Sequence, residues 1–197
     1  MVFRRLLAVA AVPLLLIGLS SCRSDPTVAA YVGSDEITLD QIDSYYAKAA
    51  QDPVSSQLVS ENGGEVKPRL VSMLVFIELL REAADDAGVP VTAGDVAQTK
   101  TQVEPQREMV TGDLALLPLD ELAEFQAYRV KLSQWAGGSN ASQQAAEQKY
   151  SQALEAAEKA NPVTINPRFG KFDLEKVPVL GSSDVAVKTA SPAPAQP

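Results

Sequence analysis

Few side chains in this 197-residue sequence could support nucleophilic, redox or metal chemistry, and the most informative of them is Cys22. It is the one cysteine of the chain, and histidine is absent. Without histidine the chain cannot build a Ser-His-Asp triad, a Cys-His pair or an imidazole metal site. With a single cysteine it cannot form an internal disulfide or a zinc cluster of thiolates.

Paired carboxylates are the acid–base groups that remain. The adjacent pairs Asp85-Asp86 and Asp120-Glu121 lie in polar helical contexts, which are typical of solvated helix faces. The sequence contains no phosphate-binding G-x-x-x-x-G-K-[ST] loop, no G-x-G-x-x-G fingerprint and no EF-hand loop. We therefore expect no catalytic, cofactor-binding or metal-binding residues, and a protein that is not an enzyme.

Cys22 closes the run Leu19-Ser20-Ser21-Cys22, at the end of a segment ordered like a secretory signal. Two arginines precede an apolar run over residues 6–19, shorter than the roughly 20 residues that a membrane helix needs. Leu-Ser-Ser-Cys resembles the lipobox of bacterial lipoproteins, which implies that the signal peptide 1–21 is removed and that Cys22 is acylated, as with palmitate. Several acyl chains give a stable anchor, so we expect the protein at the extracytoplasmic face of the bacterial cell membrane. The alternative is a cysteine beside an ordinary cleavage site, or an uncleaved anchor.

The charge balance disfavours nucleic acid as a partner. The chain has 17 basic and 25 acidic residues, a net charge of −8, and cleavage before Cys22 would remove two arginines and bring it to −10. A strongly acidic body repels phosphate backbones and anionic lipid surfaces. Removing 21 of the 197 residues would leave 176, enough for one domain with its own core.

The start of the body predicts a hairpin followed by a capped helix. Residues 28–38 read as two short strands around Gly33-Ser34-Asp35, a sequence typical of a tight turn. Thr38 and Gln41 have the spacing of a capping box, which predicts a helix start. Asp52-Pro53 is expected to stop that helix.

A long apolar helix is expected over residues 66–87, after a flexible break at Asn62-Gly63-Gly64. Its apolar residues fall on nearly every face, and Gly88 followed by Pro90 supplies a stop. A helix of this kind is either buried centrally or partly exposed for a partner. The sequence leaves that choice open.

Three further helices are expected. The capping-box pattern of Thr92 to Asp95 predicts a helix that runs to about Val110 and is exposed on most of its circumference. Residues 119–136 carry one apolar stripe, which is best explained as core, and residues 142–160 carry a weaker one. The stripe residues are Phe125, Tyr128, Leu132 and Trp135 in the first helix, and Ala146, Tyr150, Ala153 and Ala157 in the second.

The end of the sequence predicts one returning strand over residues 163–173, in which Pro167 demands an edge, a bulge or a bend. Because short strands are unstable alone, this strand is expected to pair with the N-terminal hairpin. The fold class is therefore mainly α, with about five helices and a small antiparallel β element formed by the hairpin and the returning strand. Residues 22–27 are expected to be a tether, 28–174 the helical domain, and 175–197 a disordered tail rich in Ser, Thr, Pro and Ala.

The order of these features resembles the N-terminal chaperone domain of SurA-like and PrsA-like extracytoplasmic foldases, in the lipoprotein form found in actinobacteria. The resemblance covers about residues 28–173, and it rests on the lipobox, VAAYVGSDEIT at 28–38, VTAGDV at 91–96 and NPRFG at 166–170. It implies a helical domain that holds unfolded exported chains. Many members insert a parvulin prolyl-isomerase module before the returning strand. Residues 137–161 leave no room for one, so isomerase activity is not expected.

Two functions are in contention. The first is a membrane-anchored, ATP-independent holdase that binds exported polypeptides through apolar surface. The second is a non-chaperone scaffold with the same fold, which binds a dedicated envelope protein. A broad, irregular apolar groove on helix 66–87 would favour the holdase, and a small, well-shaped pocket would favour a specific partner. A wholly covered helix would deprive both of their best surface. The sequence singles out no client-binding residues.

Overall fold

A computed structural model describes residues 25–139 and 141–174 of the chain. The predicted signal peptide 1–21, Cys22 and the tail 175–197 lie outside these residues. The described part is mainly helical, with five α-helices and a small antiparallel sheet, which confirms the predicted fold class.

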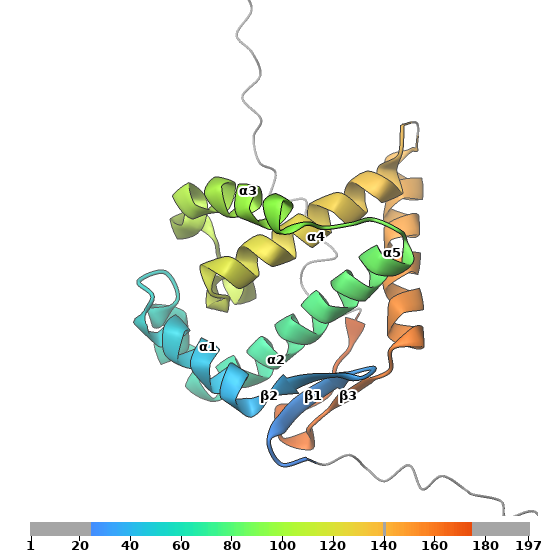
Figure 1. Ribbon diagram of the computed structural model, residues 1–197. Helices are drawn as coiled ribbons and strands as arrows, with labels where there is room; N and C mark the ends of the chain where they lie inside the picture. The colour runs from blue at the N-terminus through green and yellow to red at the C-terminus, as the bar shows by residue number, and fades with distance from the viewer. Residues whose placement is uncertain (1–24, 140, 175–197) are drawn as a thin grey trace, which may run out of the picture.

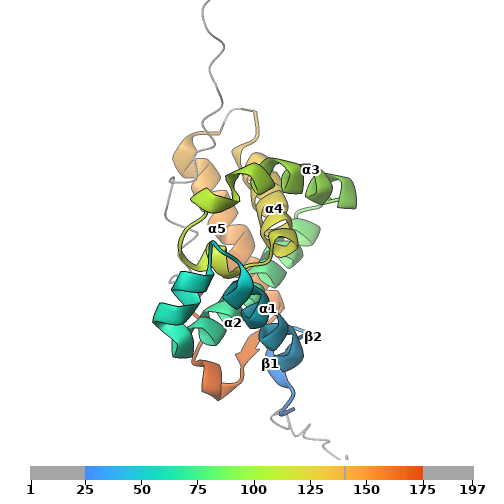
Figure 2. The same ribbon diagram turned by 90° about the vertical axis from the view of Figure 1, so that its left-hand side faces the viewer.

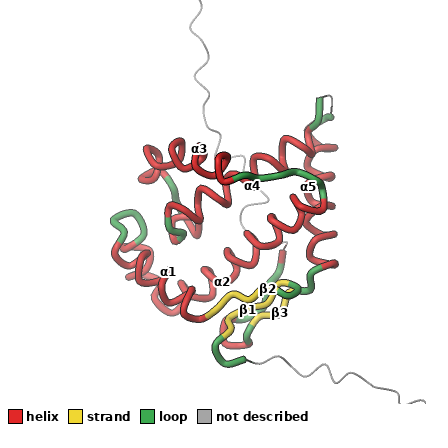
Figure 3. Tube along the Cα trace, in the orientation of Figure 1, coloured by secondary structure: helices red, strands yellow, loops and turns green. Residues whose placement is uncertain are grey.

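The sheet has three strands: β1 (Val28–Val32), β2 (Asp35–Thr38) and β3 (Val163–Ile165), in the order β2-β1-β3. Strand β1 is central, and all five of its residues are buried. Its hairpin with β2 turns at Gly33, whose φ of 57° favours glycine. Figure 3 shows the three strands together at one end of the helices.

The returning strand pairs with the hairpin as predicted, but it is much shorter than residues 163–173. It covers three residues and gives way to a 3-10 turn, η3 (Pro167–Phe169), because Pro167 has no N–H to continue the ladder. Antiparallel pairing matches Ala30 with Ile165, and the Asn166 side chain adds a hydrogen bond to the Val28 carbonyl. The two ends of the domain therefore meet at this sheet.

Hydrogen bonding of the domain begins before residue 28. The Val28 amide donates to the Asp25 carbonyl, and the Leu39 amide donates to the Thr27 carbonyl at 2.8 Å. Residues 25–27 of the predicted tether are thus a turn that is joined to the domain.

Helix α1 (Leu39–Gln51) begins and ends where the sequence predicts. The Thr38 hydroxyl accepts from the Gln41 amide, and Asp52 is the C-cap. The next helix, α2 (Ser56–Asp86), corrects a prediction, because it continues through Asn62-Gly63-Gly64 with a kink at Asn62 (φ −119°, ψ 17°) in place of a flexible break. Gly88 ends it in the left-handed region, and the Val89 amide bonds back to the Ala84 carbonyl.

Helix α2 is the centre of the core. Figure 1 shows it running diagonally through the molecule, with the sheet and α1 below it, α4 above it and α5 at its right-hand end, and Figure 2 shows the same elements from the side. It packs against all of these elements. Its largest fully buried side chains are Leu70, Met73, Phe76, Ile77, Leu79 and Leu80.

Helix α3 (Ala93–Val103) is shorter than predicted. Its reciprocal capping box between Thr92 and Asp95 is present, but the α-helix ends at Val103, seven residues before the expected Val110. Pro105 lies at the start of a 3-10 segment, η1 (Glu104–Met109), because it cannot donate the next helical hydrogen bond. None of the α3 residues is buried, so the expectation of a largely exposed helix is confirmed.

A second 3-10 segment, η2 (Gly112–Leu116), leads into α4 (Leu119–Gly137), which packs between α2 and α3. The stripe on α4 belongs to the core: Phe125 and Leu132 are fully buried, and Tyr128 and Trp135 pack against them at the margin. Helix α5 (Gln143–Ala160) then runs alongside α2 and α4 toward the sheet.

Candidate functional site

The helix expected to offer a binding surface is interior. From Val66 to Leu80, no large apolar side chain is more than 4% exposed. Within residues 25–139 and 141–174, the large apolar side chains that are exposed are Met109, at 69%, and Val130, at 44%. The choice that the sequence left open for helix 66–87 is therefore decided in favour of core, and a functional surface must be sought elsewhere.

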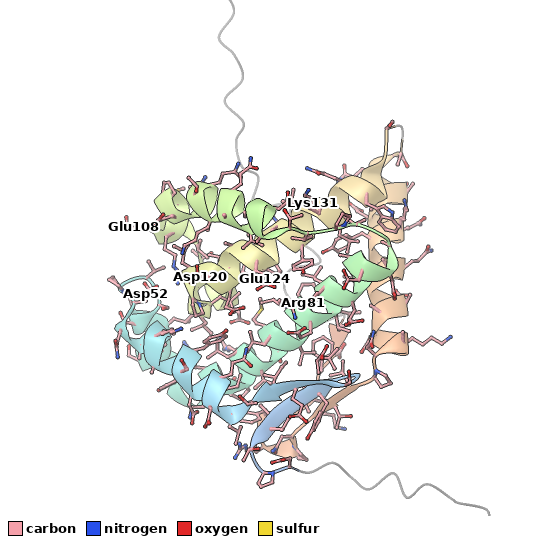
Figure 4. The ribbon with its side chains drawn as sticks, in the orientation of Figure 1. Asp52, Arg81, Glu108, Asp120, Glu124 and Lys131 are labelled. Carbon is pink, nitrogen blue, oxygen red and sulfur yellow. The ribbon has the colours of Figure 1, made fainter. Side chains whose placement is uncertain are left out.

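One candidate is a group of charged side chains between α2 and α4. Figure 4 shows Arg81 on α2 and Glu124 on α4 directed toward each other. The Arg81 Nη2 donates to Glu124 Oε1 at 2.7 Å, its Nη1 pairs with Glu78, and its guanidinium lies 5.9 Å from the centre of the Tyr128 ring. Burial raises the pKa of Glu78 despite the Arg81 charge. Burial opposes the charge of Arg81, but its hydrogen bond to Glu124 and the two carboxylates outweigh this and raise its pKa.

This cluster joins helices and carries no catalytic arrangement. Both carboxylates face a permanently charged guanidinium, which holds them as acceptors and leaves neither as an acid or base aimed at open space. The sequence-predicted carboxylate pairs do not form acid–base dyads either. Asp85, Asp86 and Asp120 are exposed as expected, and Asp120 pairs with Lys100 at 2.6 Å.

Glu121 departs from the expectation of a solvated face. It is half-buried and accepts a hydrogen bond from the Tyr45 hydroxyl on α1. Burial, reinforced by this bond, raises the pKa of Tyr45 to about 12. The side chain of Glu121 therefore ties α4 to α1.

Over the described ranges, no group of three acidic, cysteine or histidine side chains is placed to hold a metal ion. No helix in the same ranges is long and apolar enough to cross a membrane.

A defined groove lies between α5 and the segment that follows η3. It has a volume of about 440 Å³, within the range of small-ligand and peptide-side-chain pockets. Its apolar lining comes from Leu154, Phe172 and Leu174, and its polar lining from Ser151, Glu155, Glu158 and Asp173. We call it the α5 groove.

Local sequence explains why the groove forms. Helix α5 is rich in alanine and turns Leu154 and Ala157 toward the core, where both are fully buried. The chain after η3 returns along this helix, with Phe172 partly buried and Leu174 8% exposed. The groove lies where residues 172–174 run beside the Ser151, Glu155 and Glu158 face of α5.

A polar face of α5 continues from the groove toward the start of the helix. It shares Ser151 and Glu155 with the groove. The other residues of this face are also polar: Gln144, Glu147, Gln148 and Gln152. We call this face of α5 the α5 track.

The groove and the track are acidic on their rims. Among the described residues, Glu155 and Glu158 have no ion-pair or hydrogen-bond partner on their side chains, while Glu147 accepts from Gln143 at 3.0 Å. An apolar floor beside unpaired carboxylates suits a segment with apolar side chains and a lysine or arginine. Sequence reasoning missed this site, although the spacing of Phe169, Phe172 and Leu174 after the strand marks the returning segment.

Comparison with known proteins supplies no relative for this chain. No protein-family model, curated protein or solved structure matches it. The candidate site therefore rests on its own geometry.

Proposed function

We propose that this protein is an envelope lipoprotein, anchored through Cys22 at the extracytoplasmic face of the membrane, whose helical body binds one dedicated partner. The observation that carries the proposal is the contrast between α2, whose large apolar side chains from Val66 to Leu80 are buried, and the small α5 groove, which is open and chemically mixed. The resemblance to the SurA-like N-terminal domain supports an extracytoplasmic binding role of this kind. Of the two functions that the sequence suggested, the geometry supports the dedicated binder better.

The chemistry of the α5 groove defines the partner segment. Phe172, with Leu154 and Leu174 beneath it, offers a small apolar floor for one aliphatic side chain, which would contribute at most about 1.5–3 kcal/mol if it were fully buried. Glu155 and Glu158 favour a basic residue next to them and disfavour an acidic one. The partner is thus expected to present a short, extended, apolar-and-basic segment.

A holdase needs a broad apolar surface that accepts many sequences. The exposed apolar side chains of the described ranges, Met109 and Val130, do not form such a surface, because they lie on different elements, η1 and α4. Affinity for unfolded chains would have to come from burial at about 25 cal/mol per Å². We therefore place the holdase second.

The binding proposal is tested in the native envelope with a photo-crosslinking amino acid at Glu155 of the full chain. A matched probe at Gln98, exposed on α3, serves as control. We expect one adduct of fixed mass at Glu155 and none at Gln98. That adduct should fade when Glu158→Lys is added. Many adducts of different mass at both positions would support a holdase, and no adduct at Glu155 would refute the proposed site.

The anchor is tested separately by Cys22→Ala. We expect the precursor to stay unprocessed or the protein to leave the membrane fraction. Unchanged mass and unchanged membrane retention would contradict lipidation.

A further inference from the structure

We propose that the chain carries its own ligand for the α5 groove: the segment Glu175-Lys-Val-Pro-Val-Leu180, which docks along the groove and the α5 track and competes with the partner. The segment follows directly on Leu174, which itself lines the groove. The docking stands on the chemistry and geometry of this surface, whereas the competition rests on the proposed function.

The chemistry of the segment matches the groove. Val177 and Val179, which lie on the same side of an extended segment, supply aliphatic side chains for the floor made by Leu154 and Phe172. Lys176 supplies the positive charge that the rim favours, and together with the two valines it must outweigh the repulsion of Glu175 by the same rim. Beyond Leu180 most residues are Gly, Ser, Ala, Thr and Pro, and the remaining apolar-and-basic stretch, Val185 to Lys188, is eleven or more residues from Leu174.

The reach of the segment matches the surface. Six extended residues span about 20 Å at most. The track from Glu155 to Gln144 covers eleven helical steps, or about 16 Å at 1.5 Å per residue. The groove and the track share Ser151 and Glu155, so one extended segment can follow both without a break.

Covalent attachment makes the segment a strong competitor even if its own contacts are weak. A ligand tethered at the edge of its site has an effective concentration in the millimolar range. If the docked state is populated 90% of the time, a partner sees the free site one-tenth of the time, and its apparent affinity falls about tenfold. The boundary predicted at residue 175 would then move to about 180, with the low-complexity tail beginning after it.

The first test is disulfide trapping in a polypeptide that starts at Arg23. This polypeptide has no native cysteine and keeps every described buried residue, since these lie between Val28 and Leu174. One variant carries Gln148→Cys and Leu180→Cys. The control carries Ala156→Cys and Leu180→Cys, because Ala156 is exposed on the same helix but belongs to neither the groove nor the track.

At dilute protein concentration, we expect the Gln148 pair to form an intramolecular disulfide at least three times faster than the Ala156 pair. A smaller ratio would overturn the docking, because a docked segment holds residue 180 beside position 148 and away from position 156. Thermal melts of the reduced variants check that both exposed substitutions leave the domain folded.

The second test uses binding in trans and does not depend on cysteine variants. A fluorescent peptide of residues 175–185 is titrated into the polypeptide that ends at Leu174 and into the one that keeps its tail. We expect saturable binding to the first and at least fivefold weaker binding to the second. A control peptide with Lys176→Glu and Leu180→Ser should not bind. Equal binding of the two peptides, or equal affinity for the two polypeptides, would refute the proposal.

The two proposals fail in different ways. Fast trapping without any partner adduct at Glu155 would leave the docked segment and remove the proposed function. A partner adduct without trapping would leave the function and remove the internal ligand.

Discussion

Truncating Phe76 distinguishes a core helix from a client-binding helix. Phe76 lies on α2 and is completely buried, and its ring centre is 6.2 Å from that of Phe125 on α4, at an interplanar angle of 47°. A buried Phe→Ala change costs about 3–5 kcal/mol in general, because it removes transfer free energy and leaves a cavity. The aromatic contact accounts for about 0.5–1.5 kcal/mol of this.

We therefore expect Phe76→Ala to lower the free energy of unfolding by about 3–5 kcal/mol, a large part of the roughly 5–15 kcal/mol of a typical domain. Urea unfolding measures this, with the fluorescence of Trp135, the single tryptophan, as the signal. The matched control is Val130→Ala on α4. Because Val130 is 44% exposed, its truncation should change the free energy of unfolding by no more than about 0.5 kcal/mol.

The result that would refute this reasoning is a loss below about 1 kcal/mol for Phe76→Ala. Such a value would mean that Phe76 is accessible in solution, and α2 would again be a candidate surface for unfolded chains. A loss of the expected size with Phe76→Ala and none with Val130→Ala would place α2 in the interior.

Three further predictions concern the joints of the fold. Gly33→Ala should lower the free energy of unfolding by about 1–3 kcal/mol, because Gly33 has a φ of 57° and an added Cβ would lie 2.7 Å from Asn161 Oδ1. The control Gly63→Ala has open space around it and should be neutral or stabilising. Equal melting temperatures for the two variants would contradict the turn geometry. Arg107→Met should lower the free energy of unfolding by about 1.5–3 kcal/mol in urea titrations. The reason is that Arg107 Nη2 donates to Asp52 Oδ2 at 2.8 Å and to the Ala115 and Leu117 carbonyls at 2.9 and 3.0 Å. A loss no larger than that of Arg168→Met, which changes an exposed arginine, would refute this role. Burial raises the pKa of Tyr45 and of Tyr150 to about 12, so their contribution to stability is complete below pH 10 and is lost as the pH rises toward 12. Phenolate absorbance should show some tyrosines that ionise well above pH 10, and Tyr150→Phe should remove one of them. Ionisation of all five tyrosines near pH 10 would contradict the burial of Tyr45 and Tyr150.

The elements that sequence reasoning placed correctly are those with a local chemical signal. Thr38 and Thr92 cap their helices, because each hydroxyl accepts a hydrogen bond from an otherwise unpaired backbone N–H of the first turn. Gly88 ends α2, because a residue without Cβ adopts the left-handed conformation at low cost. The pairing of the returning strand with the hairpin follows from the instability of short strands alone.

The errors lie where tertiary packing or proline outweighs the local pattern. Gly63 and Gly64 each weaken a helix by about 1 kcal/mol, but packing of α2 on both sides of Asn62 carries the helix through them as a kink. Pro105 shortens α3 and Pro167 shortens β3, although the apolar spacing continues in each case.

The α5 groove was beyond sequence reasoning for a different reason. Its floor joins Leu154 to Phe172 and Leu174, which come from two elements that meet only after the strand has returned to the sheet. No periodicity within α5 marks this junction, because the α5 residues on its rim, Ser151, Glu155 and Glu158, read as an ordinary solvated helix face. A groove that forms between segments distant in the sequence is not marked by any short sequence pattern.

The central claim, that the body binds a dedicated partner and not unfolded chains in general, is tested most directly by an aggregation assay. The polypeptide that starts at Arg23 is mixed with a reduced model client, and light scattering is followed over time. Because the large apolar side chains of α2 are buried, we predict no suppression of aggregation even at a large molar excess over the client. Suppression at a near-stoichiometric ratio would contradict the account and restore the holdase.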